Sequence, residues 1–219
     1  MRDPGRTFAA PTSVYVSIER GPAAIVATMK ATTQWIAATM AFALAGCRTM
    51  LGGPRSELVS DESAGLNGGF EVMRTGVPVN WLVYSPRTIP TGEYQLVADT
   101  VEFKGGKQSL RFDVRSCSST GGWLSPGLSK EIAAVPGTTY RVGFWAKNDG
   151  AEFVAKVGGI TATEGKYETI VKTRDAMPVW RYFEHDYTMP AGFTRLRFEV
   201  NVVQPGTFWI DEVTIAAVK

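Results

Sequence analysis

The chain has 219 residues, 44% of them hydrophobic, and its 23 Lys and Arg against 21 Asp and Glu give a formal net charge of +2. This hydrophobic content excludes a wholly disordered chain. The charge forms no block along the sequence, which argues against a nucleic-acid partner bound through its phosphates. Two Cys and one His are too few for a disulfide framework or for a zinc site rich in these residues.

Residues 1–46 have the pattern of an export signal rather than of a folded segment. Met29 and Lys30 give a short positive start, and a mostly apolar run from Trp35 to Leu44 follows, with small residues after it. The run is about ten residues long, whereas a membrane-spanning helix needs about 20. A short buried helix is the alternative, but the rest of the chain offers no second amphipathic helix to pack against it.

The tetrapeptide Leu44-Ala45-Gly46-Cys47 resembles the lipobox of bacterial lipoproteins. The resemblance implies that the chain is cut before Cys47 and is then anchored to a membrane by several acyl chains on that residue. Because Arg48 and not Asp follows, it also implies the outer membrane or cell surface as the location. Residues 1–28 then have no clear role: either Met29 is the true start or the signal has a longer positive region.

Residues 47–65 separate this signal from the first predicted strand. After the Cys they carry small and polar residues and no aromatic ones, which predicts a flexible tether. Removal of residues 1–46 takes away four basic and two acidic residues, so 23 − 4 and 21 − 2 leave 19 of each sign. The mature chain is therefore formally neutral, which weakens any case for electrostatic steering. We expect it to be a monomer.

The remaining part of the chain, 66–219, alternates between apolar and polar residues in short runs. The alternation is strict in Ser109–Arg115, Thr139–Lys147 and Thr194–Val203, and a period of two is typical of a strand buried on one face. Weaker runs separated by turn signals bring the total to about eleven strands with no convincing helix: Gly69–Arg74, Val79–Tyr84, Tyr94–Asp99, Leu128–Ala134, Glu152–Val157, Tyr167–Lys172, Val179–Tyr187 and Phe208–Ala216. The sequence therefore predicts an all-β fold, a sandwich of two antiparallel sheets.

Motifs in order along 66–219 resemble carbohydrate-binding modules of families four and nine. The opening is Asn67-Gly68-Gly69-Phe70-Glu71, the middle is the strand Tyr140–Lys147, and the end is Gly206–Val213. The resemblance implies a galactose-binding-like jelly roll, in agreement with the strand pattern. It further implies that the module binds a polysaccharide or oligosaccharide and does not cleave it.

The same resemblance implies a structural calcium ion where the first and last strands meet. Its position-by-position reading points to Glu71 and Asp211 as ligands, together with backbone carbonyl groups, and oxygen ligands suit Ca²⁺. This chain departs from the family at Glu212, where a second Asp is usual. The alternative is that the two acids only cap strand ends.

Sugar binding needs a flat apolar surface beside hydrogen-bonding groups, and Trp145 is the first candidate for that surface. It shares its predicted strand face with Arg141 and Lys147, opposite Phe144. If this face is open and concave, the three form a binding plate; if a second layer covers it, Trp145 is core. Trp123, in a glycine-rich run, is the second candidate, either as a lid over the core or as an exposed plate.

Catalytic residues are hard to find in this sequence. His185 is the lone His, and no Gly-x-Ser-x-Gly elbow is present. Glu184 and Asp186 lie on one strand face and could form the pair of carboxylates that a glycosidase needs. The same spacing is equally typical of an ordinary solvent-exposed face. The Glu-x-Asp-x-x-Glu run of jelly-roll glucanases is missing. We therefore expect binding without catalysis. A structural or adhesive surface lipoprotein without a sugar site is the first alternative, and a hydrolase or lyase of jelly-roll type is the second.

Overall fold

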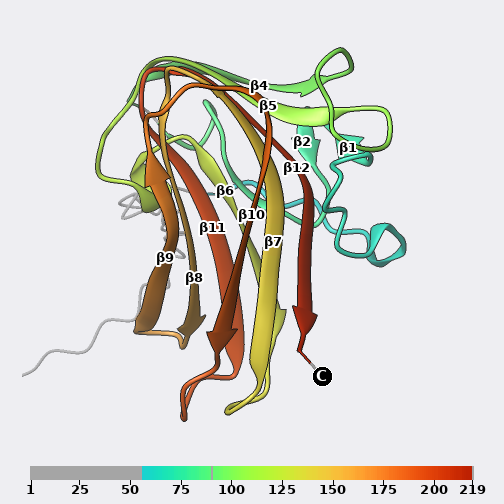
Figure 1. Cartoon of the computed structure of the whole chain (residues 1–219), viewed down its shortest axis with the longest axis vertical. Coiled ribbons are helices and arrows are strands. Elements are labelled where there is room, and N and C mark those ends of the chain that lie inside the picture. Colours follow the sequence, from blue (N-terminus) through green and yellow to red (C-terminus); the bar gives the residue numbers. More distant parts are fainter. Residues whose placement is uncertain (1–55, 90, 219) are drawn as a thin grey trace, which may run out of the picture. The chain divides into compact units, whose positions relative to one another are not determined.

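The computed structural model in Figure 1 describes residues 56–89 and 91–218. The predicted export signal, Cys47 and the start of the predicted tether lie outside these residues. Within them the chain forms an antiparallel β-sandwich of two five-stranded sheets, as the alternating side chains predict. No helix in this part of the chain is long and apolar enough to cross a membrane.

Each sheet is named after one of its long inner strands. The β7 sheet has the strand order β10-β7-β12-β5-β4, with bounds Met177–Thr188, Thr139–Asp149, Gly206–Ala217, Ser109–Ser116 and Glu93–Asp99. The β11 sheet has the order β3-β6-β11-β8-β9, with bounds Leu82–Tyr84, Gly127–Ala133, Arg195–Gln204, Glu152–Ile160 and Gly165–Thr173. A small hairpin of β1 (Met73–Arg74) and β2 (Val77–Pro78) stands apart from both sheets.

Aromatic rings fill the space between the sheets. Phe144 on β7 and Phe198 on β11 are fully buried, with ring centroids 5.4 Å apart. Phe153 on β8 and Phe208 on β12 make a second contact between the sheets at 4.4 Å. Burial of such side chains is the main stabilising term of a sandwich core. The opposite face of each sheet points outward, and these two outer faces are where a binding surface can form.

The predicted strands correspond to β1 and β3–β12, and the structure adds the two-residue strand β2. The first strand is much shorter than Gly69–Arg74. Phe70 has a φ of 56°, in the left-handed region that no extended strand includes, so pairing starts only at Met73. The side chain of Asn67 donates hydrogen bonds to Val72 O and Val79 O, both at 2.9 Å, and so closes the loop that replaces the strand.

The ordered contacts of the sandwich begin at Glu57 rather than at the predicted boundary of residue 66. Glu57 N donates to Val83 O at 2.9 Å and Val83 N donates to Glu57 O at 2.8 Å, which extends the β11 sheet beyond β3. The Glu57 carboxylate also accepts a hydrogen bond from Arg87 Nε at 2.9 Å. Pairing with an edge strand uses backbone groups only, so it can occur in a segment of polar composition that reads as a flexible tether.

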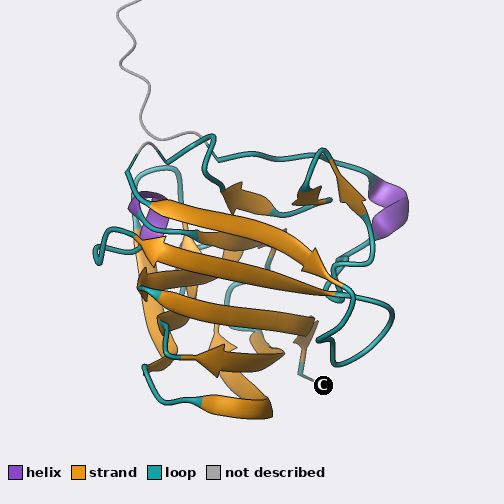
Figure 2. Cartoon of the chain, turned by 90° about the horizontal axis from the view of Figure 1, so that it is seen from above, coloured by secondary structure: helices purple, strands orange, loops and turns teal. Residues whose placement is uncertain are grey.

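Two short 3₁₀ turns, η1 (Glu62–Ala64) and η2 (Gly122–Leu124), lie on opposite sides of the strands (Figure 2). Asp61 caps η1 by accepting a hydrogen bond from Ser63 N at 3.0 Å. The run around Trp123, predicted as a loop, therefore contains a helical turn, and this turn contacts β11.

Candidate functional site

A groove of about 350 Å³ lies on the outer face of the β11 sheet. Strands β8 and β11 contribute polar side chains to it, whereas η2 and β9 each contribute an aromatic ring. The side chains that matter for its chemistry are Tyr84, Trp123, Lys156, Tyr167, Arg197 and Glu199.

Trp123 is held beside β11 by a clamp between η2 and a buried side chain. Asn201 Oδ1 accepts a hydrogen bond from Gly122 N at 2.8 Å, and Asn201 Nδ2 donates to Gly122 O at 2.9 Å. Gly122 has a φ of 58°, which a residue without Cβ adopts at little cost. The clamp fixes the turn while the Trp123 side chain stays 55% exposed.

Tyr167 gives the groove its second exposed ring. It stands on β9 directly opposite Gly158 of β8. A Cβ at Gly158 would lie 2.6 Å from Tyr167 Cδ1, so the missing side chain leaves the space that the ring occupies. The ring lies across the sheet and remains 44% exposed. A flat, exposed aromatic surface of this kind can stack on the C–H face of a sugar ring.

Between the two rings, charged and phenolic groups form one hydrogen-bonded network. Arg197 Nη2 lies 2.7 Å from Glu199 Oε2, and Arg197 Nη1 lies 3.1 Å from Glu131 Oε1. Tyr84 OH donates to Glu199 Oε2 at 3.3 Å. Burial, with a smaller contribution from the charge of Glu199, raises the pKa of Tyr84 to about 12, so the phenol keeps its proton at neutral pH.

The predicted plate of Arg141, Trp145 and Lys147 lies on the outer face of the other sheet. The three side chains share one face of β7, and Phe144 on the opposite face is fully buried. Trp145 is half-buried. Its ring packs against Tyr182 of β10 with centroids 5.2 Å apart.

Neighbouring side chains already engage the polar groups of that plate. Arg141 Nε lies 2.7 Å from Asp186 Oδ1, and Lys147 Nζ lies 2.7 Å from Glu102 Oε2. Lys104 Nζ sits 4.0 Å from the centre of the Trp145 ring, a cation–π contact that covers one ring face. A ligand would have to displace these contacts to use the plate.

Glu71 and Asp211, the predicted calcium ligands, both contact the loop of residues 104–108. Asp211 Oδ2 accepts hydrogen bonds from Lys104 N at 2.8 Å and Gly105 N at 3.1 Å, and Glu71 Oε1 accepts one from Lys107 N at 2.9 Å. The carboxylates thus hold the loop through its N–H groups.

The surroundings of Asp211 allow a test of whether a cation fits there. Its side chain is fully buried, no Lys, Arg or His of the described ranges pairs with it, and burial raises its pKa to about 6. A Cβ at Gly69 would lie 2.9 Å from Glu212 Oε1 and 3.9 Å from Asp211 Oδ1, so glycine leaves room between two acids. However, residues 56–89 and 91–218 hold no group of three or more His, Cys, Asp or Glu arranged to bind a metal. The site fits a cation only with backbone carbonyl groups as further ligands.

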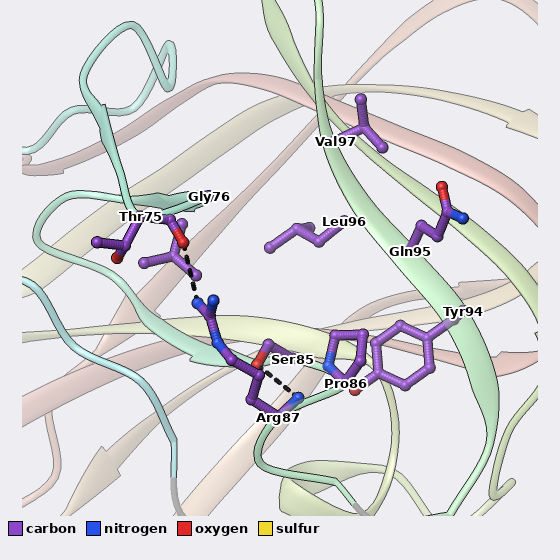
Figure 3. A pocket seen from close by; sticks show the side chains of 10 residues that line it. Thr75, Gly76, Ser85, Pro86, Arg87, Tyr94, Gln95, Leu96 and Val97 are labelled. Atoms are coloured by element: carbon purple, nitrogen blue, oxygen red, sulfur yellow. Dashed lines mark hydrogen bonds between the residues drawn. The ribbon is translucent and has the colours of Figure 1, made fainter.

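A second hollow of about 350 Å³ lies between the β1–β2 turn, residues 85–87 and β4 (Figure 3). Its cation, Arg87, donates to Thr75 O at 3.0 Å and pairs with Glu57. Its aromatic ring, Tyr94, is only 6% exposed. The groove on the β11 sheet has exposed rings and this hollow has none among its lining residues, so the groove is the better candidate for a sugar site.

Comparison with known families decides what kind of domain this is. Residues 65–206 match the family described as Carbohydrate binding domain, of type 4/9. The chain belongs to this family. No curated protein matches it.

Three solved structures resemble this carbohydrate-binding domain at low sequence identity. The CBM22-1 xylan-binding domain of Paenibacillus barcinonensis Xyn10C is 16% identical with a TM-score of 0.50, over 69% of this chain and 92% of that one. The C-terminal family 22 module of Clostridium thermocellum Xyn10B is 19% identical with a TM-score of 0.49, over 68% and 90%. A longer fragment of that xylanase, with CBM22-1 and GH10 modules, is 20% identical with a TM-score of 0.47. The match covers 58% of this chain and 25% of the fragment.

In this carbohydrate-binding domain, the four predicted sugar-binding residues are divided between two opposite faces. Trp123 lines the groove of the β11 sheet, whereas Arg141, Trp145 and Lys147 lie on the β7 sheet. Sequence reasoning did not single out four further residues that line this groove: Lys156, Tyr167, Arg197 and Glu199. The alternation of 194–203 did place the last two on an outward face, but no local pattern indicates which loop borders that face.

Proposed function

We propose that the domain binds a polysaccharide without cleaving it, in the groove between Trp123 and Tyr167. The observation that carries the proposal is the pair of exposed rings on either side of a polar floor. The rings can stack on pyranose C–H faces, while Arg197 and Glu199 can exchange hydrogen bonds with sugar hydroxyl groups. Membership of a carbohydrate-binding family supports this, and the xylan-binding neighbours make xylan the first polymer to test.

The carboxylates near the groove favour binding over hydrolysis. A glycosidase needs one acid as a proton donor and a second as nucleophile or base. Here Glu199 pairs with Arg197, and Glu131 pairs with both Arg195 and Arg197. Both acids are thus committed to arginines, which suits a binding floor.

Two tyrosines of nearly equal exposure provide the test. Tyr167 lines the groove and is 44% exposed, whereas Tyr182 lies on the opposite sheet beside Trp145 and is 42% exposed. We expect Tyr167→Ala to lose about 2 kcal/mol of binding free energy, roughly a 30-fold loss of affinity. Tyr182→Ala should bind like the wild type. Retardation in native gels that contain xylan measures both, with melting curves as the control for folding.

The reverse result would identify the plate of Arg141, Trp145 and Lys147 as the binding surface. Equal binding by both variants would leave neither face supported. If the wild-type chain is not retarded by any polysaccharide, a structural or adhesive role becomes the better account.

We also propose a bound calcium ion and a lipid anchor. Calcium is held by Glu71 and Asp211 with backbone carbonyl groups, and it would neutralise a buried acid that lacks a cationic partner in the described structure. The anchor is a lipid on Cys47, which would place the domain at the outer membrane or the cell surface. The lipobox-like sequence Leu44-Ala45-Gly46-Cys47 supports it.

A further inference from the structure

Lys156 carries a charge that its surroundings do not neutralise. It stands on β8, opposite Glu199 of β11, and its side chain is half-buried in the groove. Glu199 is engaged by Arg197 at 2.7 Å instead. Among the described residues, no acidic side chain lies within ion-pair distance of Lys156.

The charges of the floor and of its immediate neighbours, Lys156 apart, cancel one another. Glu131 pairs with Arg195 at 3.0 Å and with Arg197 at 3.1 Å, and Arg197 also pairs with Glu199. This chain of two guanidinium and two carboxylate groups is neutral by itself. Lys156 therefore adds one net positive charge, and a partly desolvated charge attracts an anion more strongly than one in open water.

The floor is also richer in hydrogen-bond donors than in free acceptors. Arg197 Nε is buried and has no hydrogen-bond partner within the described structure. Arg197 already uses its two Nη atoms on Glu131 and Glu199. Glu199, the acceptor of the groove, is already engaged by Arg197 and Tyr84, so the floor suits an acceptor-rich ligand better than a donor-rich one.

We propose that the groove selects acidic polysaccharides, and that Lys156 Nζ binds the carboxylate of a uronic acid residue stacked between Trp123 and Tyr167. The inference rests on the proposed function and names its substrate class. A neutral sugar would cover the Lys156 ammonium without supplying a counter-charge, which costs binding free energy. A uronate supplies that charge and two acceptor oxygens in one group.

Matched polymers test this directly. Glucuronoxylan, alginate and polygalacturonate are each prepared in native form and after chemical reduction of their carboxyl groups to alcohols. The full mature chain is then titrated with every pair. We expect at least one native polymer to bind tenfold or more tightly than its reduced form. Lys156→Gln should bring that ratio down toward one.

Lys172→Gln is the control variant. Lys172 lies on β9 of the same sheet, but it is 62% exposed and pairs with Glu152, so the ratio should not change. If the wild type binds native and reduced polymers equally, the acidic specificity is overturned while sugar binding stands. An equal fall of the ratio in both lysine variants also overturns it, because the attraction would then be general. Binding to no polymer in either form overturns the proposed function as well.

Discussion

Asp99 and Asp211 are both buried, but their pKa values move in opposite directions. Burial opposes the ionisation of Asp99. Hydrogen bonds from Trp209 Nε1 at 2.9 Å and Arg111 Nη1 at 2.7 Å, with two backbone N–H groups, outweigh it and lower the pKa to about 2. Asp211 receives backbone hydrogen bonds only, and burial raises its pKa to about 6. Asp99 has two side-chain donors, Trp209 and the cationic Arg111, whereas Asp211 has none among the described residues and its pKa is raised by its burial.

This contrast predicts a specific pH dependence of stability. Because the pKa of Asp211 is higher in the folded state than its ordinary value of 3.8, the folded state binds the proton more tightly than the unfolded state does. In chelator, its contribution to the free energy of unfolding therefore falls as the pH rises from 3.8 through about 6. Asp211→Asn should remove this contribution. Urea denaturation of both proteins across that range measures it, and an unchanged slope would contradict the assignment.

Calcium should reverse the effect because a bound cation favours the ionised carboxylate. At a hundred times its dissociation constant, calcium would add about 2.7 kcal/mol to the stability above pH 6. Glu71→Gln and Asp211→Asn should both lose this gain. Asp99→Asn, the control, should keep it. Identical melting curves of the wild type in calcium and in chelator would count against the site.

At the scale of elements, the turn η2 depends on β11 for its position. The side chain of Asn201, on β11, holds η2 through two hydrogen bonds to the backbone N–H and C=O groups of Gly122. Asn148 is a matched control at another site: it is 1% exposed against 2% for Asn201, and it donates to Ala151 O and Asp175 O at 2.9 and 2.8 Å. Each Asn→Ala change should cost about 1–3 kcal/mol of stability, because buried backbone groups lose their partners.

Only Asn201→Ala should also weaken polysaccharide binding, because it frees the turn that carries Trp123. Retardation in xylan gels measures binding, and hydrogen exchange of residues 121–125 measures the mobility of the turn. Faster exchange without any loss of binding would show that the position of Trp123 does not matter.

The same elements show what could be predicted from the sequence. Period two in Thr139–Lys147 predicted β7 and separated Phe144 from Trp145 correctly, because strand geometry alternates side chains wherever the strand lies. The borders of each face depend on contacts between distant residues. Gly122 is hydrogen-bonded to Asn201, and the Tyr167 ring occupies space that is open only because Gly158 in the neighbouring strand has no side chain. Such pairs leave no local pattern, which is why the sequence pointed to Trp145 and gave no sign of the groove beside Tyr167.

For the whole molecule, the two outer faces of the sandwich differ in how far their polar groups are engaged. On the β7 sheet, Arg141 and Lys147 are paired with acids. On the β11 sheet, Lys156 and Arg197 Nε lack partners within the described structure. The face with partnerless polar groups beside exposed rings is the one we assign to the ligand.

The anchor can be tested in intact cells. Because ordered contacts begin at Glu57, the ten residues from Cys47 would reach roughly 35 Å if fully extended. Cys47→Ala should move the protein from the membrane to the soluble fraction and leave polysaccharide binding unchanged. A variant that still fractionates with membranes, or a mature wild-type mass without lipid, would refute the anchor.

The central claim is that a polysaccharide chain binds on the outer face of the β11 sheet. Amide chemical shifts of the soluble Cys47→Ala protein, titrated with an oligosaccharide of a polymer that retains it, test this most directly. The account predicts the largest shift changes in η2 and in strands β8, β9 and β11, around Trp123, Lys156 and Tyr167. Changes confined to β7 and β10 around Trp145, with no response from η2, would contradict it.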